Sequence, residues 1–424
     1  MGCGELVRVD KRDLQPHIIP MVIEAQEARS VAGGAGPLPS VGRLGITRLV
    51  LTDFRNYREA RLALGTEPVV LTGPNGAGKT NLLEAVSFLA PGRGLRNARL
   101  AEIDRQCGKA PGGAVESSSG GWAVAATMTT HRGPLLIGTG RDTGDGDRRL
   151  VRIDGEPVRS QAALGERLGV VWLTPPMDRL FLDGPGGRRR FLDRLIFALD
   201  PAHASRVGAY EQALRERARL LPEGSADPAW LRALEEVMSA QGVAVAAARR
   251  DAVERLDQAC GEAEDPFPRA SLKIAGTVED WLGEMPALAV EAKFTAALAD
   301  TRRSDAVGGG AAVGPHRSEF MVSLAQTGTA AQSGSTGEQK ALLISILLAH
   351  AELRRGLRGE PPLLLFDEIA AHLDAGRRAA LFEILARFES QVWLTGTDDA
   401  LFVPLRSRAQ FLAVRDGTVS VNSP

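Results

Sequence analysis

The chain has 424 residues, 44 % of them apolar and 24 % charged, the balance of a globular protein with a sizeable core. It contains no apolar run long enough for a transmembrane helix and no secretory signal, so we expect a cytoplasmic protein without a membrane partner. A net charge of −1 excludes a uniformly basic nucleic-acid binder, and any DNA-binding surface must be local. Cys3, Cys107 and Cys260 lie far apart without metal-ligand spacing, which argues against a disulfide framework or zinc site.

Residues 1–43 end in a stretch of small residues, proline and glycine, and this composition predicts a disordered N-terminal extension. The sequence leaves open whether the extension is a genuine tail or the product of an upstream start codon.

The segment after this extension reads as strands around one helix. Alternating residues at 45–57 and 59–67 predict a strand pair, and the short apolar run 68–73 predicts a buried strand. Residues 80–90 have helical apolar spacing. Residues 122–158 read as antiparallel strands, with Asp154 and Gly155 as a hairpin turn.

The middle of the chain is mainly helical. From 188 to 264 the sequence is rich in Ala, Arg, Glu and Leu, with breaks at Pro201 and at 221–228, so we expect short helices. No heptad repeat is sustained, which argues against a long coiled coil. After the loop 308–319 we expect a strand, a long helix from 338 to about 355, a buried strand at 362–366, a helix at 375–388 and a last core strand at 391–395.

A phosphate-binding loop follows the buried strand and opens the helix, the context that this motif requires. It fits G-x-x-x-x-G-K-[ST] and consists of Gly73, Pro74, Asn75, Gly76, Ala77, Gly78, Lys79 and Thr80. Its backbone N–H groups and the helix N-terminus favour phosphate, the Lys79 ammonium neutralises it, and the Thr80 hydroxyl is suited to Mg²⁺. We therefore predict that the chain binds ATP with Mg²⁺.

An acidic strand end supplies the second half of the predicted site. Asp367 follows the apolar run 362–366 and is expected to hold Mg²⁺ through water, and Glu368 is placed to act as general base. An Asp-Glu pair after a strand is common by itself. The presence of a phosphate loop in the same chain is what favours a nucleotide-binding role for this pair. Asp367 lies 288 residues after Lys79, so a large insertion must separate the two halves. We predict ATPase lobe I at 44–175 and 356–424, with a helical lobe II at 176–355.

The segment around residue 335 is a candidate signature motif. Ser335, Gly337 and Glu338 open a long helix, and Ser335 with Glu338 fits a capping box. A cap alone would explain them. The alternative is the signature of ABC ATPases, which resembles the Ser-Gly-Gly-Glu form of SMC and Rad50 heads and contacts the γ-phosphate bound to the other subunit.

Several segments together resemble the RecF family, from about residue 44 to the end. They are ITRLVLTDFRNYREARL, GPNGAGKTNLLEAV, VVWLTPPMDRLFLDGPGGRRRFLDRLI, VGPHRSEF, the signature segment, LLLFDEIAAHLD and QVWLTGTD, in the order of the family. The resemblance implies an α/β ABC-type P-loop ATPase head, in which a mixed sheet surrounds a central helix and a mainly helical lobe II is inserted.

The resemblance also assigns roles. Asp374 would be the aspartate that senses the partner subunit, and Thr397 stands where many ABC proteins have a switch histidine, which implies slow hydrolysis. Many RecF proteins have Asp-Asp at 367–368 and Ser-Glu-Leu-Asp at 371–374, where this chain has Asp-Glu and Ala-His-Leu-Asp. The first difference favours hydrolysis, and the second bears on communication between subunits.

The function implied by the resemblance is ATP-dependent binding of single-stranded or gapped DNA during replication and recombinational repair. An ATP-dependent homodimer would clamp DNA and, with RecO- and RecR-like mediators, help RecA to load and induce the SOS response. A slow Mg-ATPase would serve as the switch. The alternatives are a transporter ATPase subunit, which the long spacing disfavours, and an SMC-like structural head with arms, which the absence of heptads disfavours.

Candidate DNA-binding cations are few. Clustered arginines can hold phosphates bidentately, and they occur at 188–190 and as Arg55 and Arg58 around Tyr57. An arginine cluster is equally often a solvated face. His316 and Arg317 are either structural or contact the nucleotide of the other subunit.

Overall fold

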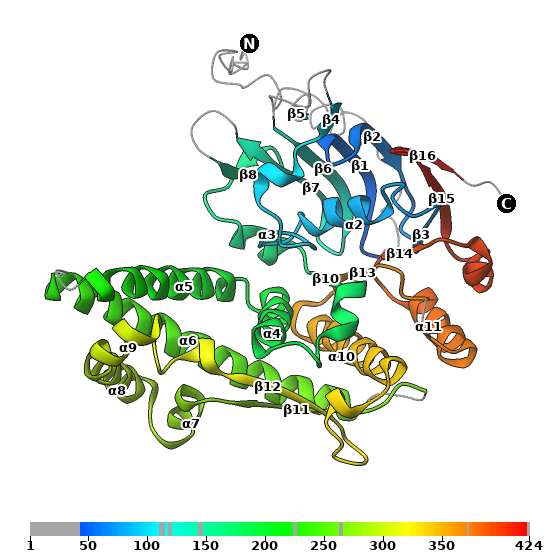
Figure 1. The fold of residues 1–424 in the computed structure, drawn as a ribbon. Coiled ribbons are helices and arrows are strands. Elements are labelled where there is room, and N and C mark those ends of the chain that lie inside the picture. The colour runs from blue at the N-terminus through cyan, green and yellow to red at the C-terminus, as the bar shows by residue number, and fades with distance from the viewer. Residues whose placement is uncertain are drawn as a thin grey trace, which may run out of the picture.

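The computed structural model describes residues 43–109, 115–117, 121–142, 147–223, 227–262, 266–370 and 373–421 (Figure 1). Apart from Arg43, the extension predicted at 1–43 lies outside the described residues, as do Ala371 and His372. In the described ranges no helix combines the length and apolar character needed to cross a bilayer.

The strands, in chain order, are β1 Gly45–Phe54, β2 Tyr57–Ala63, β3 Val69–Thr72, β4 Gln106–Lys109, β5 Val115–Ser117, β6 Ala123–Thr130, β7 Gly133–Asp142, β8 Arg148–Ile153, β9 Glu156–Pro157, β10 Val170–Leu173, β11 Ala270–Ala275, β12 Glu319–Leu324, β13 Leu363–Phe366, β14 Val392–Gly396, β15 Gln410–Arg415 and β16 Thr418–Val421. The α-helices are α2 Lys79–Ser87, α3 Ala162–Arg167, α4 Pro185–Leu199, α5 Ala202–Leu220, α6 Pro228–Gly261, α7 Thr277–Glu284, α8 Ala287–Asp300, α9 Arg302–Gly308, α10 Thr336–Arg358 and α11 Ala375–Arg387.

A parallel sheet in the order β10-β13-β14-β3-β15, with β16 antiparallel at its edge, forms the centre of the molecule. Its strands are continuous apolar runs because both faces are covered. In β13, Leu363 and Leu365 pack on the side of α2, whereas Leu364 and Phe366 pack on the side of α4 and α10. Because β13, β14 and β3 are parallel neighbours, their carboxyl ends meet at one edge of the sheet.

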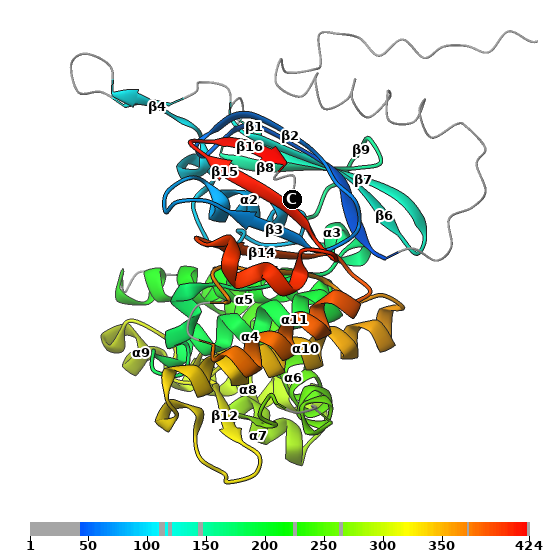
Figure 2. The same cartoon turned by 90° about the vertical axis from the view of Figure 1, so that its right-hand side faces the viewer.

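A second, antiparallel sheet in the order β2-β1-β6-β7-β8-β9 lies above the first, and α2 is held between them (Figure 2). One apolar cluster joins the inner faces of both sheets with α2, through Leu49, Leu82, Val86 and Trp393. Asp154 and Gly155 make the predicted hairpin turn between β8 and β9, both with positive φ. The predicted mixed sheets around a central helix are confirmed.

The inserted lobe is mainly helical, also as predicted, but its helices are not all short. The helix α6 has 34 residues and runs through Gly242. A Cβ at Gly242 would lie 2.9 Å from the Phe294 ring and 3.0 Å from the Tyr210 ring, so the glycine allows α5, α6 and α8 to pack closely. The helices thus close on one another instead of forming arms.

The prediction that 391–395 is the last core strand was wrong. β15 pairs in parallel with β3, and β16 pairs with β15. The apolar run 411–414 in β15 is a strand signal in the sequence that the prediction did not use. The lobe boundaries at 175 and 355 stay predictions; the second of them falls inside α10.

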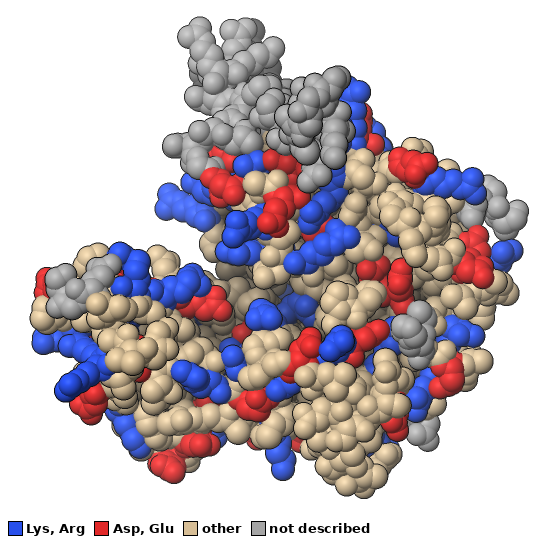
Figure 3. Space-filling view, in the orientation of Figure 1, with Lys and Arg blue, Asp and Glu red and all other residues tan. Residues whose placement is uncertain are grey.

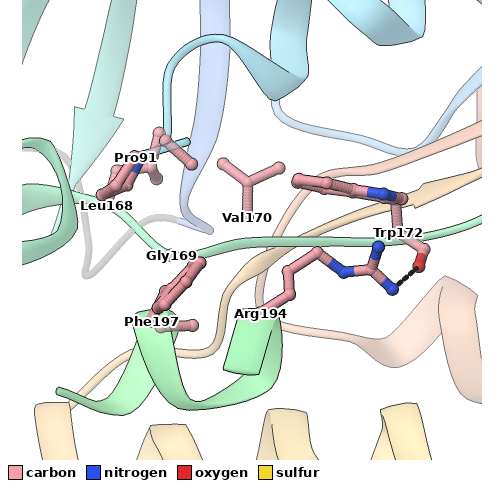
Figure 4. A pocket seen from close by; sticks show the side chains of 9 residues that line it. Pro91, Leu168, Gly169, Val170, Trp172, Arg194 and Phe197 are labelled. Atoms are coloured by element: carbon pink, nitrogen blue, oxygen red, sulfur yellow. Dashed lines mark hydrogen bonds between the residues drawn. The ribbon is translucent and has the colours of Figure 1, made fainter. Parts of the chain in front are cut away.

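Strand β10 and helix α4 meet where the sheets join the helical lobe (Figure 4). The Arg194 guanidinium lies 4.5 Å from the centre of the Trp172 ring, and its Nη2 donates to the Trp172 carbonyl at 3.4 Å. They border a cavity of about 10 Å³, room for one water molecule at most. The junction is therefore tightly packed.

Arg149, on β8, caps the carboxyl end of α2. Its guanidinium donates to the carbonyls of Phe88, Ala90 and Gly92, the last at 2.7 Å, and to the Thr139 hydroxyl at 2.8 Å. Burial lowers the pKa of Arg149 to about 9, so the side chain stays charged at neutral pH and favours the negative end of the helix dipole. Arg149 thus fixes the C-terminal end of α2, the helix whose N-terminus follows the phosphate loop.

We expect Arg149→Met to lower the free energy of unfolding by about 3 kcal/mol, because it leaves buried carbonyls without donors. The midpoint of urea unfolding measures the loss. The control is Arg148→Met on the exposed side of the same strand, for which we expect a change below about 0.5 kcal/mol. Equal midpoints for the two variants would contradict the capping role.

Candidate nucleotide-binding site

The phosphate loop connects β3 to α2 at the carboxyl edge of the parallel sheet. Gly73 has φ +148°, and a Cβ there would lie 2.1 Å from the Val414 carbonyl oxygen of β15. Gly78 has φ +115° and caps α2 without a side chain, which leaves the N–H groups of Lys79 and Thr80 at the start of the helix available to an anion. Pro74, Asn75 and Gly76 are exposed at the tip of the loop.

Two hairpin turns support the loop from outside the motif. The Asn56 side-chain amide and the Gly417 N–H both donate to the Ala77 carbonyl, each at 3.1 Å. The Tyr57 hydroxyl donates to the Gly78 carbonyl at 3.0 Å. The β1–β2 turn and the β15–β16 turn therefore fix the curvature of the loop. Tyr57 was noted in the sequence only as the residue between Arg55 and Arg58, and Asn56 was not singled out, so their role had no signal in the sequence.

The Lys79 ammonium lies under the loop and donates to the carbonyls of Gly73 at 2.6 Å and Pro74 at 2.9 Å. Burial lowers the pKa of Lys79, and the charges of Glu368 and Asp367 oppose that shift. The positive charge is thus held between the loop and the acidic strand end, where phosphate oxygens would be neutralised.

Asp367 meets Thr80 across the sheet edge. The Thr80 hydroxyl lies 3.0 and 3.1 Å from the two carboxylate oxygens of Asp367, which is 6 % exposed. Thr395 on β14, the strand between β13 and β3, donates from its hydroxyl to the Asp367 carboxylate at 2.7 Å. Thr395 belongs to the segment QVWLTGTD but was assigned no role from the sequence, and the strand order places it here.

Glu368 has a left-handed backbone with φ +52°. Its N–H donates to the Thr395 hydroxyl at 2.8 Å, so one threonine holds both acidic residues. Non-glycine residues in this conformation persist only where their surroundings enforce it, and they cluster at functional sites.

These residues fit a nucleotide with Mg²⁺. The hydroxyl of Thr80 and the carboxylate of Asp367 supply the oxygen ligands that Mg²⁺ prefers, and they already lie within hydrogen-bonding distance. The uncapped N-terminus of α2 and the Lys79 ammonium supply donors for phosphate.

The signature residues lie on another element. Ser335 is the exposed N-cap of α10; its Oγ accepts from the Glu338 N–H at 3.3 Å, and Glu338 accepts from the Ser335 N–H at 2.8 Å. Gly337 is partly buried in the first turn. The capping box is present, and it keeps the N-terminus of α10 at the surface of the helical lobe, away from α2 (Figure 1).

Asp374 and Thr397 are both exposed. The Asp374 carboxylate caps α11 by accepting from the Arg377 N–H at 2.8 Å. Thr397 follows the carboxyl end of β14, two residues after Thr395, and so lies at the same edge as the acidic pair.

Glu84 of α2, which the sequence did not single out, is fully buried between two cations. Arg55 binds its carboxylate with two hydrogen bonds of 2.7 and 2.8 Å, and Arg96 binds it at 2.6 Å. Arg55 is thus part of the support of α2, whereas Arg58 is exposed.

The arginine cluster at 188–190 is divided in the same way. Arg188 donates to Glu319 and Arg189 to the Ser318 carbonyl, each at 2.7 Å, whereas Arg190 is exposed. These bonds join the start of α4 to the segment that follows His316. The sequence pattern predicted the cluster but not which of its members have internal partners.

His316 has a structural role. Its Nδ1 accepts from the Tyr210 hydroxyl at 2.6 Å, and its Nε2 donates to the Ala311 carbonyl at 3.0 Å. Burial lowers the pKa of His316, which fits this neutral tautomer. Arg317 donates to the same Ala311 carbonyl at 3.2 Å.

The parallel sheet, the phosphate loop facing an acidic strand end, and the inserted helical lobe define the head of an ABC-type P-loop ATPase. The model of the RecF/RecN/SMC N-terminal domain family matches residues 45–418.

Among curated proteins, the chain is 48 % identical to the DNA replication and repair protein RecF of Mesorhizobium japonicum, over 88 % of this chain and 97 % of that protein. It is 45 % identical to the RecF protein of Rhizobium johnstonii, over 89 % and 99 %. The chain therefore belongs to the RecF family.

Solved structures agree on the fold. The structure of the recombination mediator protein RecF-ATPrS in the RecFOR pathway is similar with a TM-score of 0.76 and 20 % identity, over 90 % of this chain and 99 % of that one. The corresponding RecF-ATP structure has a TM-score of 0.73 at the same identity and coverage.

Proposed function

We propose that this chain acts in DNA replication and recombinational gap repair as an ATP-dependent DNA-binding protein. Its relatives with 48 % and 45 % identity over almost their whole length are DNA replication and repair proteins. The dependence on ATP is inferred from the contact of Thr80 with Asp367. This contact brings oxygen ligands for Mg²⁺ together beside the phosphate loop from positions 287 residues apart.

Each residue of the site has a separate task in this proposal. Lys79 and the N-terminus of α2 bind the phosphates, and Thr80 with Asp367 hold Mg²⁺, which stabilises charge on the transferred phosphoryl group. Glu368 accepts a proton from the attacking water. Thr397 cannot donate or accept a proton as a histidine would, which favours slow hydrolysis.

Two copies of the chain would complete the site. Ser335 is exposed at a helix N-terminus, where its hydroxyl and the neighbouring N–H groups suit a γ-phosphate, and it lies away from the phosphate loop of its own chain. Asp374 is exposed at the start of α11 and would sense the second subunit. RecO- and RecR-like mediators would act with the closed dimer on single-stranded or gapped DNA. Together they would help RecA to load on that DNA.

Binding to duplex, single-stranded and gapped DNA, each with ATP, ADP or no nucleotide, tests the proposal. We expect tighter binding with ATP than with ADP, and a dimer that forms with ATP alone. Lys79→Arg should weaken both. Equal DNA affinity under all nucleotide conditions would rule out ATP-dependent binding.

The exposed arginines give a second test. On the face shown in Figure 3, Lys and Arg side chains border a hollow between the β-rich part and the part of the helical lobe that contains α5. We expect Arg190→Ala to weaken DNA binding several-fold, because a phosphate contact is lost, without a change in thermal stability.

Arg188→Ala is the matched variant. It should lower stability, because Glu319 and the carbonyls of Phe181 and Asp183 lose a donor. Measurement of DNA affinity by fluorescence anisotropy at two salt concentrations distinguishes the two arginines. Unchanged affinity and salt dependence in Arg190→Ala would remove Arg190 from the DNA-binding surface.

A further inference from the structure

Lys340 lies inside the protein between the signature helix and the acidic strand end. It belongs to α10, five residues after Ser335, and is 2 % exposed. Its ammonium lies 3.4 Å from the backbone carbonyl of Glu368 and 3.4 Å from the carboxylate of Asp178, in the 3-10 helix Pro175–Arg179 that follows β10. One side chain thus joins α10 to two other elements beside the site.

The contact with Glu368 completes the fixation of that residue. The Glu368 N–H is held by the Thr395 hydroxyl at 2.8 Å, and the Glu368 carbonyl is held by Lys340. A left-handed backbone at a glutamate needs such fixation, because a β-carbon disfavours it. Lys340 therefore helps to determine where the Glu368 carboxylate points.

These bonds form a continuous path within one chain. From the phosphate loop to the signature helix it runs through Thr80, Asp367, Thr395, Glu368 and Lys340. Five residues of α-helix span about 7.5 Å, so Ser335 and Lys340 move together with the N-terminal turns of α10. A displacement at Ser335 would reach Glu368 through the first turns of α10 and one hydrogen bond, from Lys340 to the Glu368 carbonyl.

Carboxylates lie around the Lys340 ammonium inside the protein. Burial lowers the pKa of Lys340, while the carboxylates of Asp178, Glu368 and Asp367 oppose that shift. An ammonium donates more strongly to a carbonyl than a neutral group does, so the charge strengthens its contact with Glu368.

We propose that Lys340 is a positioning residue that couples the signature end of α10 to the general base Glu368 of the same chain. The inference rests on the proposed dimer, in which Ser335 contacts the γ-phosphate bound by the partner subunit. Engagement of Ser335 at one nucleotide would then align Glu368 at the other, and the two sites would hydrolyse ATP cooperatively.

The test measures steady-state ATP hydrolysis by the full chain as a function of ATP concentration, together with ATP-dependent dimerisation by sedimentation. We expect Lys340→Met to lower kcat roughly tenfold and to abolish cooperativity, with KM within about twofold of the parent, because the lost bond orients Glu368 and not the nucleotide. Lys340→Arg should restore most of the rate and the cooperativity.

Two further variants separate coupling from folding. The double variant Lys340→Met with Asp178→Asn removes both charges, so it should fold, and it should show the same loss of kcat and cooperativity. Arg355→Met removes an exposed cation near the other end of α10 and should behave like the parent.

The outcomes distinguish the inference from the proposed function. A parent chain that stays monomeric with ATP overturns both. A parent that dimerises and hydrolyses cooperatively, with Lys340→Met or the double variant doing the same, overturns only the coupling. Failure of Lys340→Arg to restore the rate also overturns it, because a merely space-filling role would then explain the loss.

Discussion

Glu368→Gln should lower the rate of ATP hydrolysis by roughly 10²- to 10⁴-fold, the usual contribution of a general base, while ATP binding is retained. The amide keeps the shape of the carboxylate but cannot accept a proton at neutral pH. The backbone bonds of Glu368 to Thr395 and Lys340 do not involve the replaced atoms and should persist. We therefore expect an ATP-bound dimer that forms normally and dissociates slowly, and DNA that stays bound for longer.

The measurement is single-turnover hydrolysis, followed by the lifetime of the dimer after dilution into excess ADP. Asp367→Asn is the matched control because it changes the neighbouring carboxylate to an amide. It should weaken Mg²⁺-dependent nucleotide binding because the amide is uncharged and keeps only one of the two oxygens that face Thr80, and so it should yield no long-lived dimer. Hydrolysis by Glu368→Gln within about threefold of the parent rate would exclude Glu368 as the base.

The parts of the site that the sequence predicted are those that local pattern determines. The phosphate loop needs glycines at fixed spacing, and a strand covered on both faces must be an apolar run, so Gly73–Thr80 and Leu363–Phe366 could be found in the sequence. The carboxyl ends of parallel strands share an edge, which led directly from the two motifs to one site.

The remaining parts of the site depend on strand order and on distant contacts. Thr395 bridges Asp367 and Glu368 only because β14 lies between β13 and β3, an order that no local pattern encodes. Lys340 follows the signature motif as one more polar residue of an amphipathic helix, and Arg149 is one of several arginines on β8. Their burial is a property of the packed fold.

Charge clusters were the least informative pattern. Arg55 and Arg188 have the same surroundings in sequence as Arg58 and Arg190, but the first pair is bonded to Glu84 and Glu319 and the second pair is exposed. A carboxylate 29 or 131 residues away decides the difference, and its approach cannot be read from neighbouring residues.

Ser335→Arg should abolish ATP-dependent dimerisation while a monomer still binds ATP with an affinity close to that of the parent. Ser335 is exposed and lies on the helical lobe, whereas Lys79 and the contact of Thr80 with Asp367 lie at the edge of the parallel sheet, so the nucleotide site of the same chain is not changed. A long side chain at the N-terminus of α10 would occupy the space that a γ-phosphate of the partner subunit needs. Loss of the capping box costs about 1 kcal/mol, too little to unfold a 23-residue helix whose inner face is buried.

Fluorescent-nucleotide titration and sedimentation with and without ATP measure the two properties separately. Ser335→Ala removes the same cap without adding bulk, so it should weaken the dimer only partly, and Gln326→Arg places an equal charge on an exposed turn of the same lobe and should dimerise like the parent. Normal dimer formation by Ser335→Arg would mean that the N-terminus of α10 does not face the second nucleotide.

Glu368→Gln and Ser335→Arg should act at opposite stages, because the first keeps the dimer closed and the second prevents its closure. In the double variant the effect of Ser335→Arg should dominate, because slow hydrolysis cannot prolong the lifetime of a dimer that does not form.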